Sequence, residues 1–152
     1  MSVSAIILAA GEGTRMRSTR PKPLHLICGR AMVLHVIHAL EAVHPERTAI
    51  VVGHGAEQVT KKVQLMAPEW ANVAFVEQRE QNGTGDAAAT GMAALSGDDY
   101  DDESTILVLP GDTPLLRPET LRELLDVHVE CGNAATLLTS VMEDPTGYGR
   151  VI

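Results

Sequence analysis

The sequence predicts an α/β fold of three αβα layers, in which a mostly parallel, Rossmann-like sheet lies between helices. Short apolar runs rich in β-branched residues alternate with segments whose apolar residues recur at helical spacing. Strands that alternate with helices are joined by right-handed crossovers, which give parallel strands between helical layers. Aromatic residues make up only 3% of the 152 residues, so the core must be built from aliphatic side chains.

The first half of the chain supplies two strands and two helices. Residues 3–8 are apolar and β-branched, which predicts a short buried strand. A helix is predicted over 32–40, where apolar residues recur every three or four positions. Residues 48–53 form a second apolar strand that closes on a glycine, and 56–66 form a second helix with one apolar stripe.

The next strand and helix are separated by polar residues. Residues 73–76 are predicted as a third strand. An alanine-rich helix is predicted over 86–95, with Thr84 as a candidate N-cap, since a threonine oxygen can accept from the first-turn N–H groups. Residues 97–104 carry four Asp and one Glu, so we expect a solvated acidic loop.

The last part of the chain repeats the alternation. Residues 105–109 predict a fourth buried strand. Pro118 opens a helix that runs to about residue 131, because proline suits the first helical turn, and Gly132 stops it. Residues 134–142 are predicted as a fifth strand.

Charge and composition exclude several classes of protein. The formal net charge of −8 argues against nucleic acid or an anionic membrane as a partner. No apolar run approaches the roughly eighteen residues of a membrane span, and the N-terminus lacks the charged region of a signal peptide. Cys28 and Cys131 have neither disulfide nor zinc spacing, and the histidines are scattered. We therefore expect a soluble, cytoplasmic protein without a zinc site.

The loop after the first strand has the composition of a phosphate-binding site. Gly11 and Gly13 let the backbone approach a ligand, with N–H groups available to phosphate oxygens. Arg15 and Lys22 add one forked and one point cation. Met16 replaces the third glycine of a Rossmann fingerprint, and no Gly-Lys pair exists for a P-loop. A turn with solvated cations is the alternative, but the whole run favours a nucleoside triphosphate.

Two further segments could complete such a site. Asp112 follows a buried strand and Gly111, and one carboxylate with phosphate and water oxygens is a typical Mg²⁺ ligand set, although Asp112 could also cap a turn. Gln78 can both donate and accept, as reading a pyrimidine edge requires. Gly83 and Thr84 open the next helix, where unpaired N–H groups could meet a base carbonyl. A polar loop with a helix cap would explain this segment equally well by itself.

Several of these residues are expected at one edge of the sheet. Gly11, Gly53, Gln78 and Asp112 all fall at or just after the ends of predicted strands. In parallel α/β sheets ligands bind beyond the carboxyl ends of the strands. We therefore expect the candidate site residues to lie close together at this edge of the sheet.

Four stretches of the chain resemble, in order, the sugar-1-phosphate nucleotidyltransferases: residues 8–25, 78–87, 111–115 and 144–150. The Gly-Thr-Gly segment and the Gly-Tyr-Gly-Arg ending are similar to the uridyltransferase domain of the bacterial bifunctional uridyltransferase/acetyltransferases. The resemblance spans essentially the whole chain and implies their nucleotidyltransferase fold. It also implies transfer of a uridylyl group from UTP to N-acetylglucosamine 1-phosphate. The products would be pyrophosphate and UDP-N-acetylglucosamine for peptidoglycan synthesis, with Mg²⁺ as cofactor.

The resemblance assigns roles residue by residue. Arg15 would hold the β- and γ-phosphates and stabilise departing pyrophosphate, with Lys22 on the phosphates beside it, as the two catalytic residues. Asp112 would bind Mg²⁺, and Gly149 would contact the N-acetyl group of the sugar. The sugar phosphate would attack the α-phosphorus of UTP in line, so the reaction would need no side-chain nucleophile. The positions expected to bind the nucleotide are Leu8, Ala9, Gly11, Gly13, Gln78, Gly83, Thr84 and Gly111.

The chain also departs from the family. Asp86 stands where relatives commonly have histidine, and we interpret it as helix surface. The chain stops as another strand begins, so we expect residues 1–152 to be the nucleotide-binding part of a longer domain, ending before the sugar-binding segment. Little turnover is expected from this part alone, and a trimer only where a C-terminal acetyltransferase domain is present. Two alternatives stay open: a non-catalytic nucleotide-binding module, or transfer of thymidylyl, cytidylyl or guanylyl groups.

Overall fold

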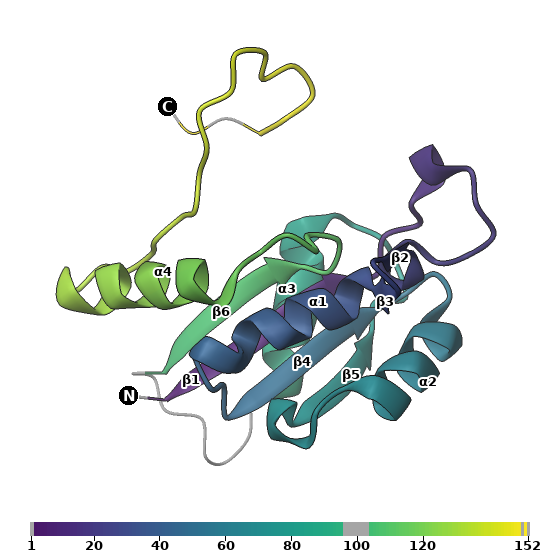
Figure 1. Cartoon of the computed structure of the whole chain (residues 1–152), viewed down its shortest axis with the longest axis horizontal. Coiled ribbons are helices and arrows are strands. Elements are labelled where there is room, and N and C mark those ends of the chain that lie inside the picture. The colour runs from purple at the N-terminus through teal and green to yellow at the C-terminus, as the bar shows by residue number, and fades with distance from the viewer. Residues whose placement is uncertain (1, 96–103, 150, 152) are drawn as a thin grey trace.

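A sheet of four parallel strands forms the centre of the computed structural model, which describes residues 2–95, 104–149 and 151 (Figure 1). The strand order across the sheet is β5–β4–β1–β6, and each neighbouring pair is parallel. A separate antiparallel pair joins two very short strands, β2 and β3. The strands are β1 (Val3–Ala9), β2 (Leu26–Ile27), β3 (Arg30–Ala31), β4 (Arg47–Val52), β5 (Val73–Glu77) and β6 (Thr105–Pro110).

Helices cover both faces of the sheet, so the three-layer α/β prediction is confirmed. Of the described helices, three pack against one face, and α3 is the only one that packs against the other, over β4, β1 and β5 (Figure 1). The helices are α1 (Met32–Ala39), α2 (Ala56–Met66), α3 (Thr84–Leu95) and α4 (Pro118–Glu130). Among the described helices, none combines the length and apolarity that crossing a bilayer demands.

The central strands are buried on both faces, as their continuous apolar sequences predict. Successive side chains of a strand point to opposite faces, so Ile6 of β1 packs toward α3 while Ile7 packs toward α1, α2 and α4. Both isoleucines are 0% exposed. Gly91 of α3 lies directly over Ile6, and its missing side chain allows the helix to approach the sheet closely. The rigid sheet built this way fixes where the strands end.

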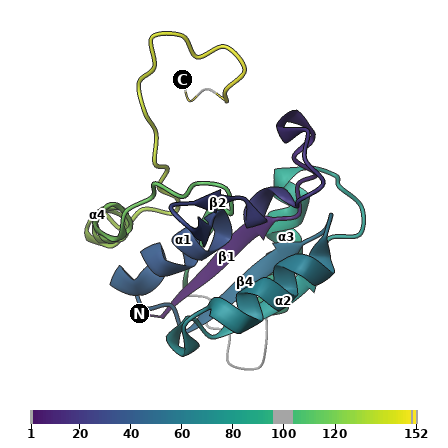
Figure 2. The same ribbon diagram turned by 45° about the vertical axis from the view of Figure 1, so that its right-hand side comes forward.

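Two sequence predictions about the elements were wrong. The predicted fifth strand at 134–142 is not a strand: the segment leaves the body after α4, and Leu137, Leu138 and Val141 are all more than half exposed (Figure 2). A β-prone run becomes a strand only where it finds a ladder partner, and this segment pairs with none of the described strands. Thr84 is the first residue of α3 rather than its cap, since the Gly83 carbonyl accepts the N–H of Ala87 at 3.2 Å.

The other predicted elements agree with the structure to within a few residues. The first four predicted strands correspond to β1, β4, β5 and β6, and the four predicted helices to α1–α4. The predicted acidic loop at 97–104 lies outside the described residues, apart from Ser104.

Candidate functional site

The carboxyl ends of β1, β4, β5 and β6 lie at one edge of the sheet, and hydrogen bonds tie together the loops that leave it (Figure 1). The Gly111 N–H donates to the carbonyl of Leu8 at 2.8 Å. The Gln78 N–H donates to the carbonyl of Val52 at 2.8 Å. The predicted gathering of these loop residues at one edge is therefore what the structure shows.

Two glycines let the strand ends approach this closely. A Cβ on Gly111 would lie 2.9 Å from the Leu8 carbonyl oxygen and 3.2 Å from the Cβ of Ala9. A Cβ on Gly53 would lie 2.9 Å from the carbonyl oxygen of Ala10. Real Cβ atoms do not sit 2.9 Å from another heavy atom, so the backbone at this edge is packed as only glycine permits.

Contacts within the first loop hold Lys22 near the sheet. Gly13 has a left-handed φ of 63°, and a Cβ there would lie 2.7 Å from the Cβ of Lys22. Pro21, directly before Lys22, is buried and packs on Gly55, where a Cβ would meet the proline ring at 2.3 Å. Lys22 then begins a short 3₁₀ turn over Lys22–Leu24. The lysine backbone is thus anchored, and the first carbons of its side chain lie against Gly13.

The Lys22 ammonium forms an ion pair with the carboxylate of Asp112, which joins the first loop to the loop after β6. The two side chains are 38% and 32% exposed, so solvent screens the pair, and such pairs contribute at most about 1 kcal/mol to stability. Ninety residues separate the two positions in sequence, and the parallel pairing of β1 with β6 brings them together. The predicted phosphate cation and the predicted metal ligand are therefore in direct contact.

Asp112 offers one carboxylate, which fits a hard cation such as Mg²⁺ that takes its other ligands from elsewhere. Within residues 2–95, 104–149 and 151, no cluster of three or more His, Cys, Asp or Glu side chains could hold a metal ion. Mg²⁺ commonly binds through one or two carboxylates and takes its other ligands from phosphate and water. Asp112 can supply that single carboxylate, whereas an all-protein metal cage has no counterpart in this part of the chain.

Beside the ion pair the strand ends surround a cavity of about 310 Å³, at the lower end of the size range of small-molecule sites. Gln78 is 6% exposed, and its side-chain nitrogen Nε2 donates to Oδ2 of Asp86 at 2.7 Å and to the Gly83 carbonyl at 3.4 Å. The Gln81 side chain donates to the carbonyl of Ala10 at 2.9 Å. The cavity is lined by Leu8, Ala10, Gly11, Gln78, Gln81, Gly83, Thr84, Ala87 and Pro110.

Most of the sequence-predicted residues fall into two groups in the structure. Leu8, Gly11, Gln78, Gly83 and Thr84 share the cavity, whereas Ala9 of the same strand belongs to the core on the opposite face. Adjacent to them are the residues of the ion pair and its glycines: Gly13, Lys22, Gly111 and Asp112.

Arg15 and Gly149 are not brought to the cavity. Arg15 is exposed on a 3₁₀ turn, Thr14–Met16, within the arm that projects from the sheet edge (Figure 2). Gly149 is exposed at the end of the segment that leads away from the body after α4. Both residues lie on segments with little packing of their own.

Sequence reasoning missed two side-chain hydrogen bonds at the cavity, one accepted by Asp86 and one donated by Gln81. Asp86, interpreted as helix surface, is exposed but accepts a hydrogen bond from Gln78 eight positions earlier. Gln81 bridges to the end of β1 across a separation of 71 positions. Both residues lie in the polar stretch 78–87. No spacing rule links residues across a loop, so the sequence could predict a polar site in this stretch but not these two hydrogen bonds.

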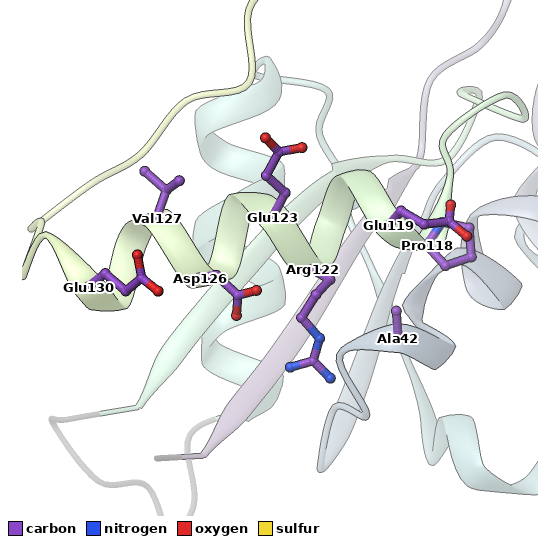
Figure 3. A pocket seen from close by; sticks show the side chains of 8 residues that line it. All are labelled: Ala42, Pro118, Glu119, Arg122, Glu123, Asp126, Val127 and Glu130. Atoms are coloured by element: carbon purple, nitrogen blue, oxygen red, sulfur yellow. The ribbon is translucent and has the colours of Figure 1, made fainter.

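A second hollow, of about 460 Å³, lies on the outer side of α4 against Ala42, remote from the strand ends (Figure 3). Although larger than the cavity, it is lined mainly by charged side chains of one helix, which point in different directions rather than toward a common point (Figure 3). It is an open surface groove, and none of the candidate site residues lines it.

Comparison with known proteins gives one family match and a consistent set of relatives. The family described as MobA-like NTP transferase domain matches residues 5–150. The bifunctional protein GlmU of Thermobifida fusca is 46% identical over 149 residues, which cover 98% of this chain and 30% of that protein. GlmU of Streptomyces avermitilis is 48% identical with the same coverage. The chain thus spans about 30% of the length of these curated relatives.

Solved structures show the same fold. A nucleotidyl transferase from Methanothermobacter aligns with a TM-score of 0.67 at 25% identity, covering 82% of this chain and 57% of that one. A UDP-glucose pyrophosphorylase complexed with UDP-glucose aligns with a TM-score of 0.63 at 20% identity, covering 87% and 55%. At 20% identity the second likeness concerns the fold alone.

Proposed function

This chain belongs to the MobA-like NTP transferase family, and from that membership we propose that residues 1–152 form the nucleotide-binding part of a uridylyltransferase. The proposed reaction transfers a uridylyl group from UTP to N-acetylglucosamine 1-phosphate, giving UDP-N-acetylglucosamine and pyrophosphate. The GlmU relatives, at 46–48% identity over 98% of the chain, support this choice of substrates.

The observation that carries the proposal is the contact between Lys22 and Asp112 beside the cavity at the strand ends. A triphosphate needs a cation and a site for its metal next to a pocket that accepts the nucleoside. An ion pair this exposed adds little to stability, so a structural role explains it poorly. A bound nucleotide would instead use both partners, Lys22 on a phosphate and Asp112 on the metal.

The chemistry assigned to the residues is positioning and charge stabilisation. Lys22 and Arg15 would hold the phosphates and stabilise the negative charge that departs with pyrophosphate. Asp112 would hold Mg²⁺, which when bound neutralises phosphate charge and orients the triphosphate. Because Arg15 lies on the projecting arm, the proposal requires this arm to close over the phosphates.

The nucleoside would occupy the cavity. Gln78, with the N–H groups of Gly83 before α3 and of Thr84 at its start, would read the uracil edge. Gly111 would lie beside the ribose, at the point where its missing side chain lets the loop approach the end of β1. Leu8, Gly11 and Gly13 would contribute backbone and apolar contacts to the nucleoside and phosphates. Ala9, whose side chain lies in the core on the opposite face, would contribute its backbone alone.

The sugar phosphate is the less complete half of the proposal. Gly149 would contact the N-acetyl group only if its segment folded back toward the strand ends. We place the remaining sugar-binding residues outside residues 1–152, so slow turnover is expected from this chain alone. Its substrates are cytoplasmic metabolites, which is why we propose a cytoplasmic enzyme. A trimer is expected only together with a C-terminal acetyltransferase domain.

Calorimetric titration of the chain with UTP in the presence of Mg²⁺ tests the proposal. UTP is expected to bind more tightly than CTP, dTTP or GTP, and Asp112→Ala is expected to remove the contribution of Mg²⁺. The matched control is Asp126→Ala, which removes an acidic side chain from the groove on α4 and should leave binding unchanged. Equal binding of all four nucleotides, or an equal effect of both substitutions, would reject the assignment.

A further inference from the structure

The side chain of Gln78 is held in one orientation by its neighbours. It is 6% exposed, its Nε2 donates to Oδ2 of Asp86 at 2.7 Å, and the same nitrogen lies 3.4 Å from the Gly83 carbonyl oxygen. A carboxylate and a carbonyl can only accept hydrogen bonds. The amide nitrogen must therefore face both of them, because the flipped amide would oppose oxygen to oxygen at 2.7 Å.

This orientation decides what Gln78 can offer to a ligand. Both N–H groups of the amide are directed at protein acceptors, which leaves the oxygen Oε1. Within the described part of the chain Oε1 makes no hydrogen bond. A glutamine without Asp86 beside it could present either end of its amide. With Asp86 in place it presents an acceptor alone.

The neighbouring groups of the cavity have the opposite polarity. Thr84 begins α3, so the first N–H groups of that helix lack partners within the helix and can donate to a ligand. The cavity therefore offers one fixed acceptor near a set of donors. Uracil carries the complementary edge, an N3–H between two carbonyl oxygens, whereas cytosine has a bare acceptor at N3.

We propose that Asp86 is a positioning residue for base selection: it fixes the Gln78 amide so that Oε1 accepts the N3–H of uracil and opposes the N3 of cytosine. The inference rests on the proposed nucleotide-binding function of the cavity. Asp86 itself need not touch the base, since it acts through the orientation of Gln78. Its location in the first turn of α3 also suits the helix dipole, which is the structural role that an experiment must separate.

Asp86→Asn is the direct test, because asparagine has the same shape but can donate as well as accept. The affinities of the chain for UTP and CTP are measured by calorimetry with Mg²⁺. The ratio of UTP to CTP affinity is expected to fall about fivefold to tenfold, the scale of one hydrogen bond. Asp126→Asn on α4 makes the same charge change away from the cavity and should leave the ratio unchanged. An unchanged ratio in Asp86→Asn would overturn the inference.

Exchanging the amide of Gln78 with the carboxylate of Asp86 should rescue UTP binding, which a purely structural role of Asp86 would not do. Gln78→Glu places a carboxylate against Asp86 and is expected to lose UTP binding. In the Gln78→Glu, Asp86→Asn double variant the asparagine nitrogen can donate to the new carboxylate, which again presents an acceptor to the base. The double variant should bind UTP better than Gln78→Glu alone. Binding no better than that of the single variant would contradict the inference.

The orientation of the amide can also be observed without nucleotide. The side-chain NH₂ signals of Gln78 in an NMR spectrum of the ¹⁵N-labelled chain should shift in Asp86→Asn and stay in place in Asp126→Asn. Unshifted signals would show that Asp86 does not hold Gln78. If the signals shift but the wild-type chain binds no nucleotide, the proposed function fails, and base selection by Asp86 fails with it.

Discussion

Gly91 and Gly85 lie in the same helix, α3, yet alanine should have opposite effects on stability at the two positions. Gly91 faces the sheet, where a Cβ would lie 2.5 Å from Cγ2 of Ile6 and 3.1 Å from Cγ2 of Val51. Gly85 is exposed at the first turn, with no atom within 4 Å of its Cβ position. The pair therefore separates the cost of crowding from the preference of helices for alanine.

The magnitudes follow from these distances. At Gly91 the new methyl group would lie 2.5 Å from Cγ2 of Ile6, which is about 0.9 Å closer than the 3.4 Å at which ordinary van der Waals contacts begin. Ile6 is 0% exposed in a central strand, so it cannot swing away. Crowding a packed core lowers the free energy of unfolding by about 1–3 kcal/mol. Alanine in place of glycine inside a helix raises it by about 0.5–1 kcal/mol. Gly91→Ala should therefore lower the free energy of unfolding by about 1–2 kcal/mol, while Gly85→Ala should raise it by about 0.5 kcal/mol.

Urea denaturation of both variants beside the wild-type chain measures the difference. The two midpoints should differ by roughly 1 M, since m-values of small proteins are about 1–3 kcal/mol/M in urea. A Gly91→Ala variant as stable as Gly85→Ala would refute the close approach of α3 to the sheet. The position of α3 places the Gly83 and Thr84 N–H groups at the cavity, so that placement would then be refuted as well.

Three further predictions concern buried and charged groups. Thr48→Val should raise the free energy of unfolding by about 1 kcal/mol in urea denaturation, because the Thr48 hydroxyl is buried without a hydrogen-bond partner in the described chain. Asp112→Asn should change that free energy by less than about 1 kcal/mol while removing the Mg²⁺ dependence of UTP binding, which calorimetry and denaturation can show together. Burial, followed by the charge of Arg30, lowers the pKa of His38 below its ordinary 6.5, so unfolded His38 binds a proton at higher pH than folded His38. Stability should therefore fall as the pH drops below about 6.5, and His38→Gln should flatten that decrease in pH-dependent unfolding curves.

Much of the fold could be predicted because its signals are local. The run at 3–8 is mostly apolar and half β-branched, and it forms the inner strand β1 with both faces covered. The segment at 134–142 has a similar composition but no ladder partner, which composition cannot reveal. Thr84 has the right residue type for a cap, yet the helix extends to include it.

The candidate site was predictable to the level of loops. Strand ends in a parallel sheet share one edge, so the positions of Gly11, Gln78 and Asp112 followed from chain order. The contact of Lys22 with Asp112 depends on the path of the first loop and on a side-chain conformation, neither of which sequence spacing encodes. The bond from Gln78 to Asp86 depends likewise on a turn of the chain between β5 and α3.

The central claim is that nucleotide binds at the carboxyl edge of the sheet, and an NMR titration of the ¹⁵N-labelled chain with UTP and Mg²⁺ tests it most directly. Shifted backbone signals are expected to cluster in three loops: residues 10–22, 78–86 and 110–113. Signals along α4, where the groove against Ala42 lies, are expected to stay unshifted (Figure 3). Shifts centred on α4, or no shifts at all from a folded chain, would contradict nucleotide binding at this edge.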